Sequence, residues 1–287
     1  MNWSKEQNQQ KLKELYGVEF PDALFGVHEF MISSTENDDK SMALSVIGLY
    51  PAGPLEILLE FDDLLEAKFL DNPLLHCRYY RDVPEFFTCL TGECDGEHWG
   101  MLLDEPTRGF RGVASYYNND GDEIVVYKSL FDAILSRCDE QISGCQEWIS
   151  ESDDSEEIAG YQRQIEEILQ FRFEFEKFLA KSSLLVDESR PEGLYSDTGL
   201  SVIRPEDFNP DTQGEAIAAL AAGRSLWYWH GEEHSSKGYN LLREAYLTLE
   251  RYELIRILDI HYQNRSNGWV DLLENHLAGI SSGNDTV

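Results

Sequence analysis

Between residues 75 and 126 the chain is a succession of short apolar runs separated by turn residues, and this pattern constrains the fold most strongly. Runs rich in Val, Phe, Tyr and Thr that are bounded by Gly, Asn and Asp are typical of β-strands. The pattern predicts strands at residues 76–80, 86–90, 98–103, 113–117 and 124–127, the last two joined by the hairpin signal Asn-Asn-Asp-Gly at 118–121. We therefore expect an α+β fold with an antiparallel sheet of four to five strands flanked by helices.

Helical patterns precede and follow these strands. Residues 4–15 and 22–31 are expected to be helices, and Pro21 favours the start of the second. Another helical pattern runs through residues 129–135, and two more cover 215–220 and 239–262. Ser152, Asp153, Asp154 and Ser155 suit the N-cap of a long helix. That helix has its apolar residues mostly three or four positions apart: Ile158, Tyr161, Ile165, Ile168, Phe175 and Leu179.

One segment stands out as a linker. Residues 187–212 include Pro191, Gly193, Gly199, Pro205 and Pro210, which oppose both helix and strand. We therefore expect an α+β sheet domain at residues 1–150 and a mainly helical domain at residues 151–287, packed on the first, with a loop at 187–212.

The net charge of the chain limits the classes of partner that it is expected to bind. Its 54 Asp and Glu against 23 Lys and Arg give a formal net charge of −31. Nucleic acids and anionic membranes attract clustered cations, so neither is expected to bind directly. The acidic residues are either a solvated surface or, in part, a docking face for a basic protein. A polar N-terminus and the lack of a long apolar run favour a cytoplasmic location, or a nuclear one in a eukaryote.

Few motifs suggest chemistry within the chain. His230-Gly231-Glu232-Glu233-His234 matches an inverted zinc-protease pattern, but Gly231 and the following Ser-Ser favour a polar turn. Cys89, Cys94 and His98, with His76 or Cys77, offer zinc ligands, although alternating strand positions also bury cysteines in a core. The sequence has no phosphate loop, G-x-S-x-G or G-x-G-x-x-G motif. We expect five free, mostly buried thiols, no metal site, no cofactor and no enzyme activity of the chain alone.

Two stretches carry a family resemblance. The first is LHCRYYRDVPEFFT at residues 75–88, followed by Gly92, His98-Trp99-Gly100-Met101 and Asp104-Glu105-Pro106. The second covers residues 226–265 and ends LIRILDIHYQNR. Together with the helix that opens at Phe20-Pro21-Asp22, they resemble the histone PARylation factor family, including its bacterial relatives. A similar Pro-Glu-Phe and His-Trp-Gly pattern occurs in the SUKH superfamily of bacterial immunity proteins.

The resemblance to histone PARylation factors implies a protein that docks on an ADP-ribosyltransferase and lends a glutamate as general base for the acceptor serine. Counted without gaps from Leu226, that glutamate falls on Gln213, which cannot accept the proton. Glu215 and Asp211, two residues to either side, are therefore the candidate catalytic carboxylates. The predicted partner-binding residues are Arg204, Trp227, Trp229 and His230.

We therefore expect a non-catalytic accessory protein that engages an ADP-ribosyltransferase or an ADP-ribosylated partner. The alternative, which the charge and the SUKH-like pattern support, is an immunity protein that neutralises a basic toxin by direct binding. An enzyme that uses Glu215 or His230 is a third reading of the same residues.

Overall fold

The computed structural model describes residues 4–34, 40–66, 72–93, 96–103, 105–118, 124–182, 213–229 and 235–265. Three helices precede the first strand in the chain: α1 (Lys5–Tyr16), α2 (Asp22–Ser34) and the 3₁₀ helix η1 (Lys40–Ile47). Helix α3 (Gly53–Glu66) follows that strand. The strands are β1 (Tyr50–Pro51), β2 (Phe86–Thr91), β3 (Glu97–Leu102), β4 (Val113–Tyr117) and β5 (Val125–Tyr127), with the 3₁₀ helix η2 (Pro106–Arg108) between β3 and β4. The later helices are α4 (Leu130–Glu151), α5 (Ser155–Lys181), α6 (Gln213–Trp229), α7 (Ser235–Thr248) and α8 (Tyr252–Asn264).

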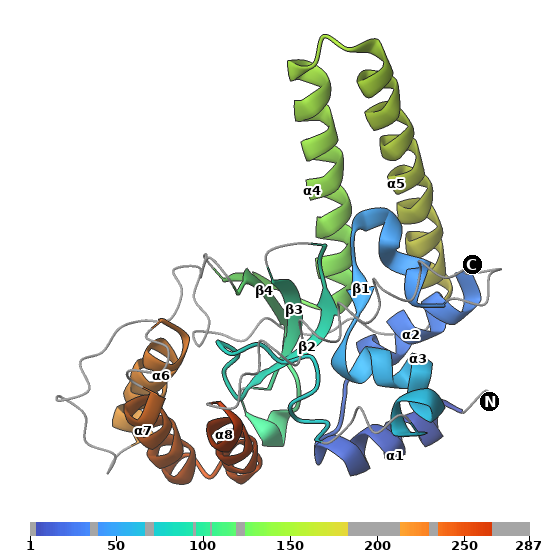
Figure 1. Ribbon diagram of the computed structural model, residues 1–287. Helices are drawn as coiled ribbons and strands as arrows, with labels where there is room; N and C mark the ends of the chain where they lie inside the picture. The colour runs from blue at the N-terminus through green and yellow to red at the C-terminus, as the bar shows by residue number, and fades with distance from the viewer. Residues whose placement is uncertain are drawn as a thin grey trace.

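The strands form one antiparallel sheet in the order β1-β2-β3-β4-β5. Helices flank it on both sides, and a helical region follows it in the chain (Figure 1). The predicted α+β class is therefore confirmed, and four of the five predicted strands are present as β2 to β5. β1 lies at the sheet edge, where Pro51 is tolerated because a proline has no N–H to donate.

The predicted strand at residues 76–80 is wrong. Cys77 has a φ of 56°, which is the left-handed region and incompatible with an extended strand. The backbone N–H of Arg78 donates to the Leu75 carbonyl at 3.3 Å, so the chain turns here. The short run resembles a strand in sequence, but its polar side chains form contacts with other parts of the chain, as described below.

The two faces of the sheet bury different parts of the chain. Adjacent residues on a strand point to opposite faces. The ring of Phe87 lies 5.9 Å from Phe20 and 5.1 Å from Phe110, on the side of α1 and α2. The ring of Phe86 lies 5.5 Å from Tyr116, which also packs against Tyr228 of α6. The N-terminal helices and α6 therefore cover opposite faces of the sheet (Figure 1).

Helices α4 and α5 form an antiparallel hairpin that projects away from the sheet (Figure 1). As predicted, Asp154 caps α5, accepting from the backbone N–H of Glu156 at 2.7 Å. At the base of the hairpin Phe175 is buried against Phe30 of α2, with ring centroids 4.9 Å apart. Near its tip Trp148 is 58% exposed and stacks on Tyr161. The base therefore belongs to the core, whereas the outer turns are solvated.

Two further expectations concern the described residues. None of their helices has the length and apolar character needed to cross a bilayer. Four cysteines fall within the described ranges, and all are free thiols: Cys89, Cys138 and Cys145 are buried and Cys77 is half-buried. The predicted linker at 187–212 lies outside the described residues, and the division of the chain at residue 150 stays a prediction.

Gly100→Ala is expected to lower the free energy of unfolding by about 1–3 kcal/mol, because a methyl group there overlaps the buried Phe86 ring. Gly144→Ala is the matched control, since a methyl group at Gly144 meets no atom and α4 gains about 0.5–1 kcal/mol from the replacement. Urea unfolding of both variants measures the difference. Equal stability of the two would show that β2 and β3 do not pack this closely in solution.

Candidate functional site

Residues 74–85, which we call the anchor segment, lie between α3 and β2 and lead directly into β2. They contain no helix or strand. Three charged side chains of this segment are buried: Arg78, Asp82 and Glu85 have exposed fractions of 4%, 1% and 0%. Charged groups are rarely buried so completely unless they are paired. The shape of the anchor segment is therefore set by the partners of these side chains.

Asp82 is the centre of a buried polar network. Its carboxylate accepts from Thr88 Oγ1 at 3.0 Å, from the backbone N–H of Tyr79 at 2.9 Å and from the hydroxyl of Tyr116. Nε2 of His98 lies 2.9 Å from its Oδ1. Burial by itself raises the pKa of Asp82, but His98, by charge and hydrogen bond, together with Arg78 and Tyr116, holds that pKa below its ordinary value.

An acid, a histidine and a tyrosine in contact resemble a catalytic constellation, but this one is sealed. Asp82 and His98 are 1% and 0% exposed, and the second ring nitrogen of His98 bonds the Gly96 carbonyl at 2.7 Å. A general base must come within hydrogen-bond reach of its substrate. In this structure the network therefore orders the anchor segment against β3 and β4 and has no access to a reactant.

Helix α6 is attached to the anchor segment by three side chains. Nε and Nη2 of Arg224 donate to Glu85 Oε1 at 2.9 and 2.7 Å, both side chains being fully buried. Nε1 of Trp227 donates to the Asp82 backbone carbonyl at 2.9 Å, and the Tyr228 ring packs on Tyr116. These contacts fix the position of α6 along the sheet.

Helix α8 is attached to the same segment. Arg265, just past its end, places its guanidinium 4.0 Å from the Tyr80 ring and 3.8 Å from the Trp227 ring, and Nη2 donates to the Trp227 carbonyl at 2.7 Å. Nε2 of His261 bonds the Leu74 carbonyl at 3.1 Å. Burial, with the charge of Arg78, holds the pKa of His261 well below its ordinary value, so the ring donates as neutral imidazole.

Glu215 lies in the first turn of α6, where a negative charge is favourable. The residue is half-buried: its Oε2 atom and the neighbouring Ala216 are buried, whereas Gly214 and Ile217 in the same turn are exposed. A carboxylate at such a place can accept a proton from a hydroxyl group that a partner brings to it. Glu215 is therefore the predicted site residue that the described structure presents near solvent.

The other predicted site residues have different placements. Trp227 is 1% exposed, so within this chain it holds α6 in place and offers little surface to a partner. Trp229 is the last residue of α6. Asp211, Arg204 and His230 lie outside the described residues.

The zinc reading of Cys89, Cys94 and His98 is disfavoured by the contacts of two of its members. Cys89 is buried, its Sγ donates to the Trp99 carbonyl at 3.4 Å, and burial raises its pKa to about 12. Both ring nitrogens of His98 have oxygen partners. Cys94 lies outside the described residues. Cys89 and His98 are therefore core residues, as the alternative reading of the strands predicted.

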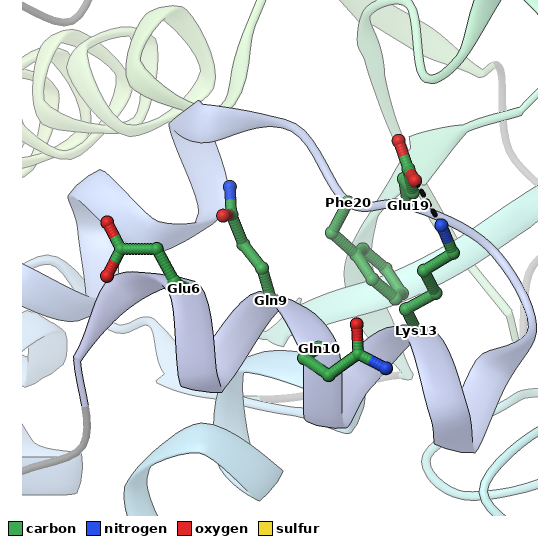
Figure 2. A pocket seen from close by; sticks show the side chains of 6 residues that line it. All are labelled: Glu6, Gln9, Gln10, Lys13, Glu19 and Phe20. Atoms are coloured by element: carbon green, nitrogen blue, oxygen red, sulfur yellow. Dashed lines mark hydrogen bonds and ion pairs between the residues drawn. The ribbon is translucent and has the colours of Figure 1, made fainter.

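A shallow hollow lies along α1, where it meets the start of α2 (Figure 2). It has a volume of about 260 Å³ and is lined by Glu6, Gln9, Gln10, Lys13, Glu19 and Phe20. Lys13 and Glu19 form an exposed ion pair within it. Lys13 is already paired with Glu19, and no buried acid or base faces the space, so we do not assign a site to this hollow.

The sequence analysis did not predict that the anchor segment holds α6 and α8 in place. Its signal was present: Arg78, Asp82 and Glu85 recur every three or four residues in a run that also contains Tyr79, Tyr80, Val83 and two phenylalanines. It also missed a cluster of Glu56, His76 and Cys77, whose potential ligand atoms lie within 4.8 Å of one another.

Comparison with known proteins adds a further observation. A family model described as Histone PARylation factor 1 matches residues 7–182, from α1 through α5 and including the sheet and the anchor segment. Histone PARylation factor 1 of Danio rerio is 28% identical over 102 residues, which are 35% of this chain and 29% of that protein. The aligned region thus spans less than a third of this curated relative. Helix α6, with Glu215, lies beyond the residues that the family model matches.

Proposed function

Because the chain belongs to the histone PARylation factor family, we propose that it is an accessory protein that binds an ADP-ribosyltransferase and lends a carboxylate to serine modification by that enzyme. The carboxylate is Glu215, with Asp211 as the other candidate. The chain by itself is not the enzyme in this proposal. It acts in the cytoplasm, or in the nucleus of a eukaryotic host.

The observation that carries the proposal is the placement of Glu215. It lies near solvent in the first turn of a helix whose later turns are fixed to the family motif through Arg224 and Trp227. A lent general base must be held in one position relative to the partner surface, because proton transfer requires hydrogen-bond distance. A buried ion pair and a buried indole N–H hold α6 in this way.

The exposed surface near Glu215 also suits protein docking. Ile217, two residues further along α6, is 47% exposed, and the chain carries a formal charge of −31. An exposed apolar side chain on a protein of strongly negative net charge suits a partner with a basic face, since complementary charge speeds encounter and fixes orientation. A transferase active site next to such a face would receive Glu215.

Capture experiments test the docking. The full chain, immobilised and exposed to an extract of its native host, is expected to retain an ADP-ribosyltransferase identified by mass spectrometry. Ile217→Asp is expected to weaken that capture about tenfold or more, since burying an isoleucine contributes about 1.5–3 kcal/mol. Leu169→Asp on α5 is the matched control, because Leu169 is 49% exposed and far along the chain from α6.

Two results would contradict the docking proposal. Equal loss of capture in both variants would show that the surface beside Glu215 is not the contact. Recovery of a basic toxin in place of a transferase, with binding that falls as salt rises, would make the chain an immunity protein, the second candidate that its acidic charge favours.

A further inference from the structure

Three potential metal ligands from two separate segments meet next to the anchor segment. Glu56 lies in the first turn of α3, and His76 and Cys77 are consecutive residues of the anchor segment. His76 Nε2 is 2.9 Å from Glu56 Oε2, and Cys77 Sγ donates to the same oxygen at 3.1 Å. The side chains of Glu56 and His76 retain 11% and 10% of their exposure, so water reaches the edge of the cluster.

The ligand set fits one class of metal. A thiolate sulfur, an imidazole nitrogen and a carboxylate oxygen together are the ligands of zinc and similar divalent transition metals, whereas magnesium and calcium prefer oxygen alone. Tetrahedral zinc, with bonds of roughly 2.0 Å to N and O and 2.3 Å to S, separates its ligand atoms by roughly 3.3–3.5 Å. The distances from Glu56 Oε2 to His76 Nε2 and to Cys77 Sγ, 2.9 and 3.1 Å, differ from these values by a few tenths of an ångström. The Nε2 and Sγ atoms lie within 4.8 Å of each other, so closing that pair on a zinc ion needs a shift of at most about 1.3 Å.

The backbone holds these ligands together independently of their side-chain contacts. Cys77 is one of two non-glycine residues in the described part of the chain with positive φ, at 56°. Such a conformation is costly and persists where the surrounding structure imposes it. Gly53, the first residue of α3, packs so closely on the Thr88 carbonyl that a side chain would overlap it. The start of α3 is therefore pressed against the same region.

We propose that Glu56 Oε2, His76 Nε2 and Cys77 Sγ bind a zinc-class divalent metal ion, with a water molecule as the fourth ligand. On binding, the thiol proton now donated to Glu56 leaves to solvent and sulfur coordinates as the thiolate, while the proton between His76 Nε2 and Glu56 passes to Nδ1 of the neutral ring so that Nε2 can coordinate. One proton is therefore released per metal bound. The ion cross-links α3 to the anchor segment, which holds α6 and α8. This site differs from the Cys89, Cys94 and His98 set and from the sequence-based expectation of no metal.

The test uses the full chain, stripped with a chelator and dialysed against zinc chloride. Metal analysis after gel filtration is expected to find one zinc per chain, and Co²⁺ in place of zinc is expected to give sulfur-to-cobalt charge-transfer absorption. A zinc concentration about a hundredfold above Kd is expected to raise Tm by about 5 °C or more. Cys77→Ser and His76→Gln are each expected to lose the bound zinc and the rise in Tm, and Cys77→Ser also the absorption.

Cys145→Ser is the matched control, since Cys145 lies on α4 and shares no contact with the cluster. It is expected to bind metal as the wild type does. Unfolding of each variant in chelator confirms that it is folded before metal is added. Retention of the cobalt absorption by Cys77→Ser, or a wild-type chain that gains no zinc and no Tm shift, would overturn the proposal.

Discussion

Glu215→Gln is expected to reduce the rate of serine ADP-ribosylation by the captured transferase about 100- to 10,000-fold while leaving capture unchanged. A positioned general base contributes a factor of this size, and glutamine keeps the shape of glutamate but cannot accept the proton. Position 215 lies half-buried in the first turn of α6, and glutamine has the same size as glutamate, so the replacement should keep the packing there. Transfer from NAD⁺ to a serine-containing acceptor peptide measures the rate.

Two controls separate the possible outcomes. Glu244→Gln removes an exposed carboxylate from α7 and changes the net charge equally, so it is expected to keep the full rate. Asp211→Asn tests the other candidate carboxylate. A loss of rate in Asp211→Asn alone would transfer the role of base to Asp211. Full rates in both Glu215→Gln and Asp211→Asn, with intact capture, would reject the lent carboxylate. The docking role would then remain.

Asp82→Ala is expected to lower the free energy of unfolding by about 3–5 kcal/mol, the usual cost of removing one partner from a buried charged network. The carboxylate of Asp82 accepts four hydrogen bonds, and its loss leaves His98, Thr88 and Tyr116 without that acceptor. Urea unfolding near neutral pH measures the change. Asp153→Ala is the control, since Asp153 is exposed between α4 and α5 and is expected to change stability by less than about 0.5 kcal/mol.

The effect of Asp82 is also expected to depend on pH. A carboxyl whose pKa is lowered in the folded protein stabilises it above the unfolded-state pKa, about 3.9 for Asp, and that contribution is lost as pH falls through the lower folded-state pKa. The stability difference between wild type and Asp82→Ala should therefore shrink below about pH 4. A difference that stays constant in acid would show that Asp82 is not ionised in the folded state.

Sequence patterns predicted those elements that carry clear local signals. Strands β2 to β5 have apolar runs bounded by turn residues, and α5 has both an apolar stripe and the Asp154 cap. The sequence analysis predicted no helix at α3, whose second residue is Pro54, although a proline is tolerated in the first turn of a helix. It also stopped α4 at residue 135, because the rest of that helix lies in the solvated hairpin.

The site was less predictable, because its contacts join distant parts of the chain. Glu85 and Arg224 are 139 residues apart, and Asp82 and Trp227 are 145 apart. No local period links such pairs, so the spacing of the charged residues in the anchor segment does not reveal which residues they bind. Glu215 was found through the family resemblance, whereas the polar network around Asp82 required the fold.

The attachment of α6 and α8 has an evolutionary consequence. Several of the joining bonds end on main-chain oxygens: Trp227 donates to the Asp82 carbonyl, His261 bonds that of Leu74, and Arg265 donates to that of Trp227. A carbonyl is present whatever side chain its residue carries, so the accepting positions can mutate without losing these bonds. These bonds therefore constrain the donors Trp227, His261 and Arg265, and relatives that attach their C-terminal helices in the same way will be recognised by these three donors rather than by the residues that accept.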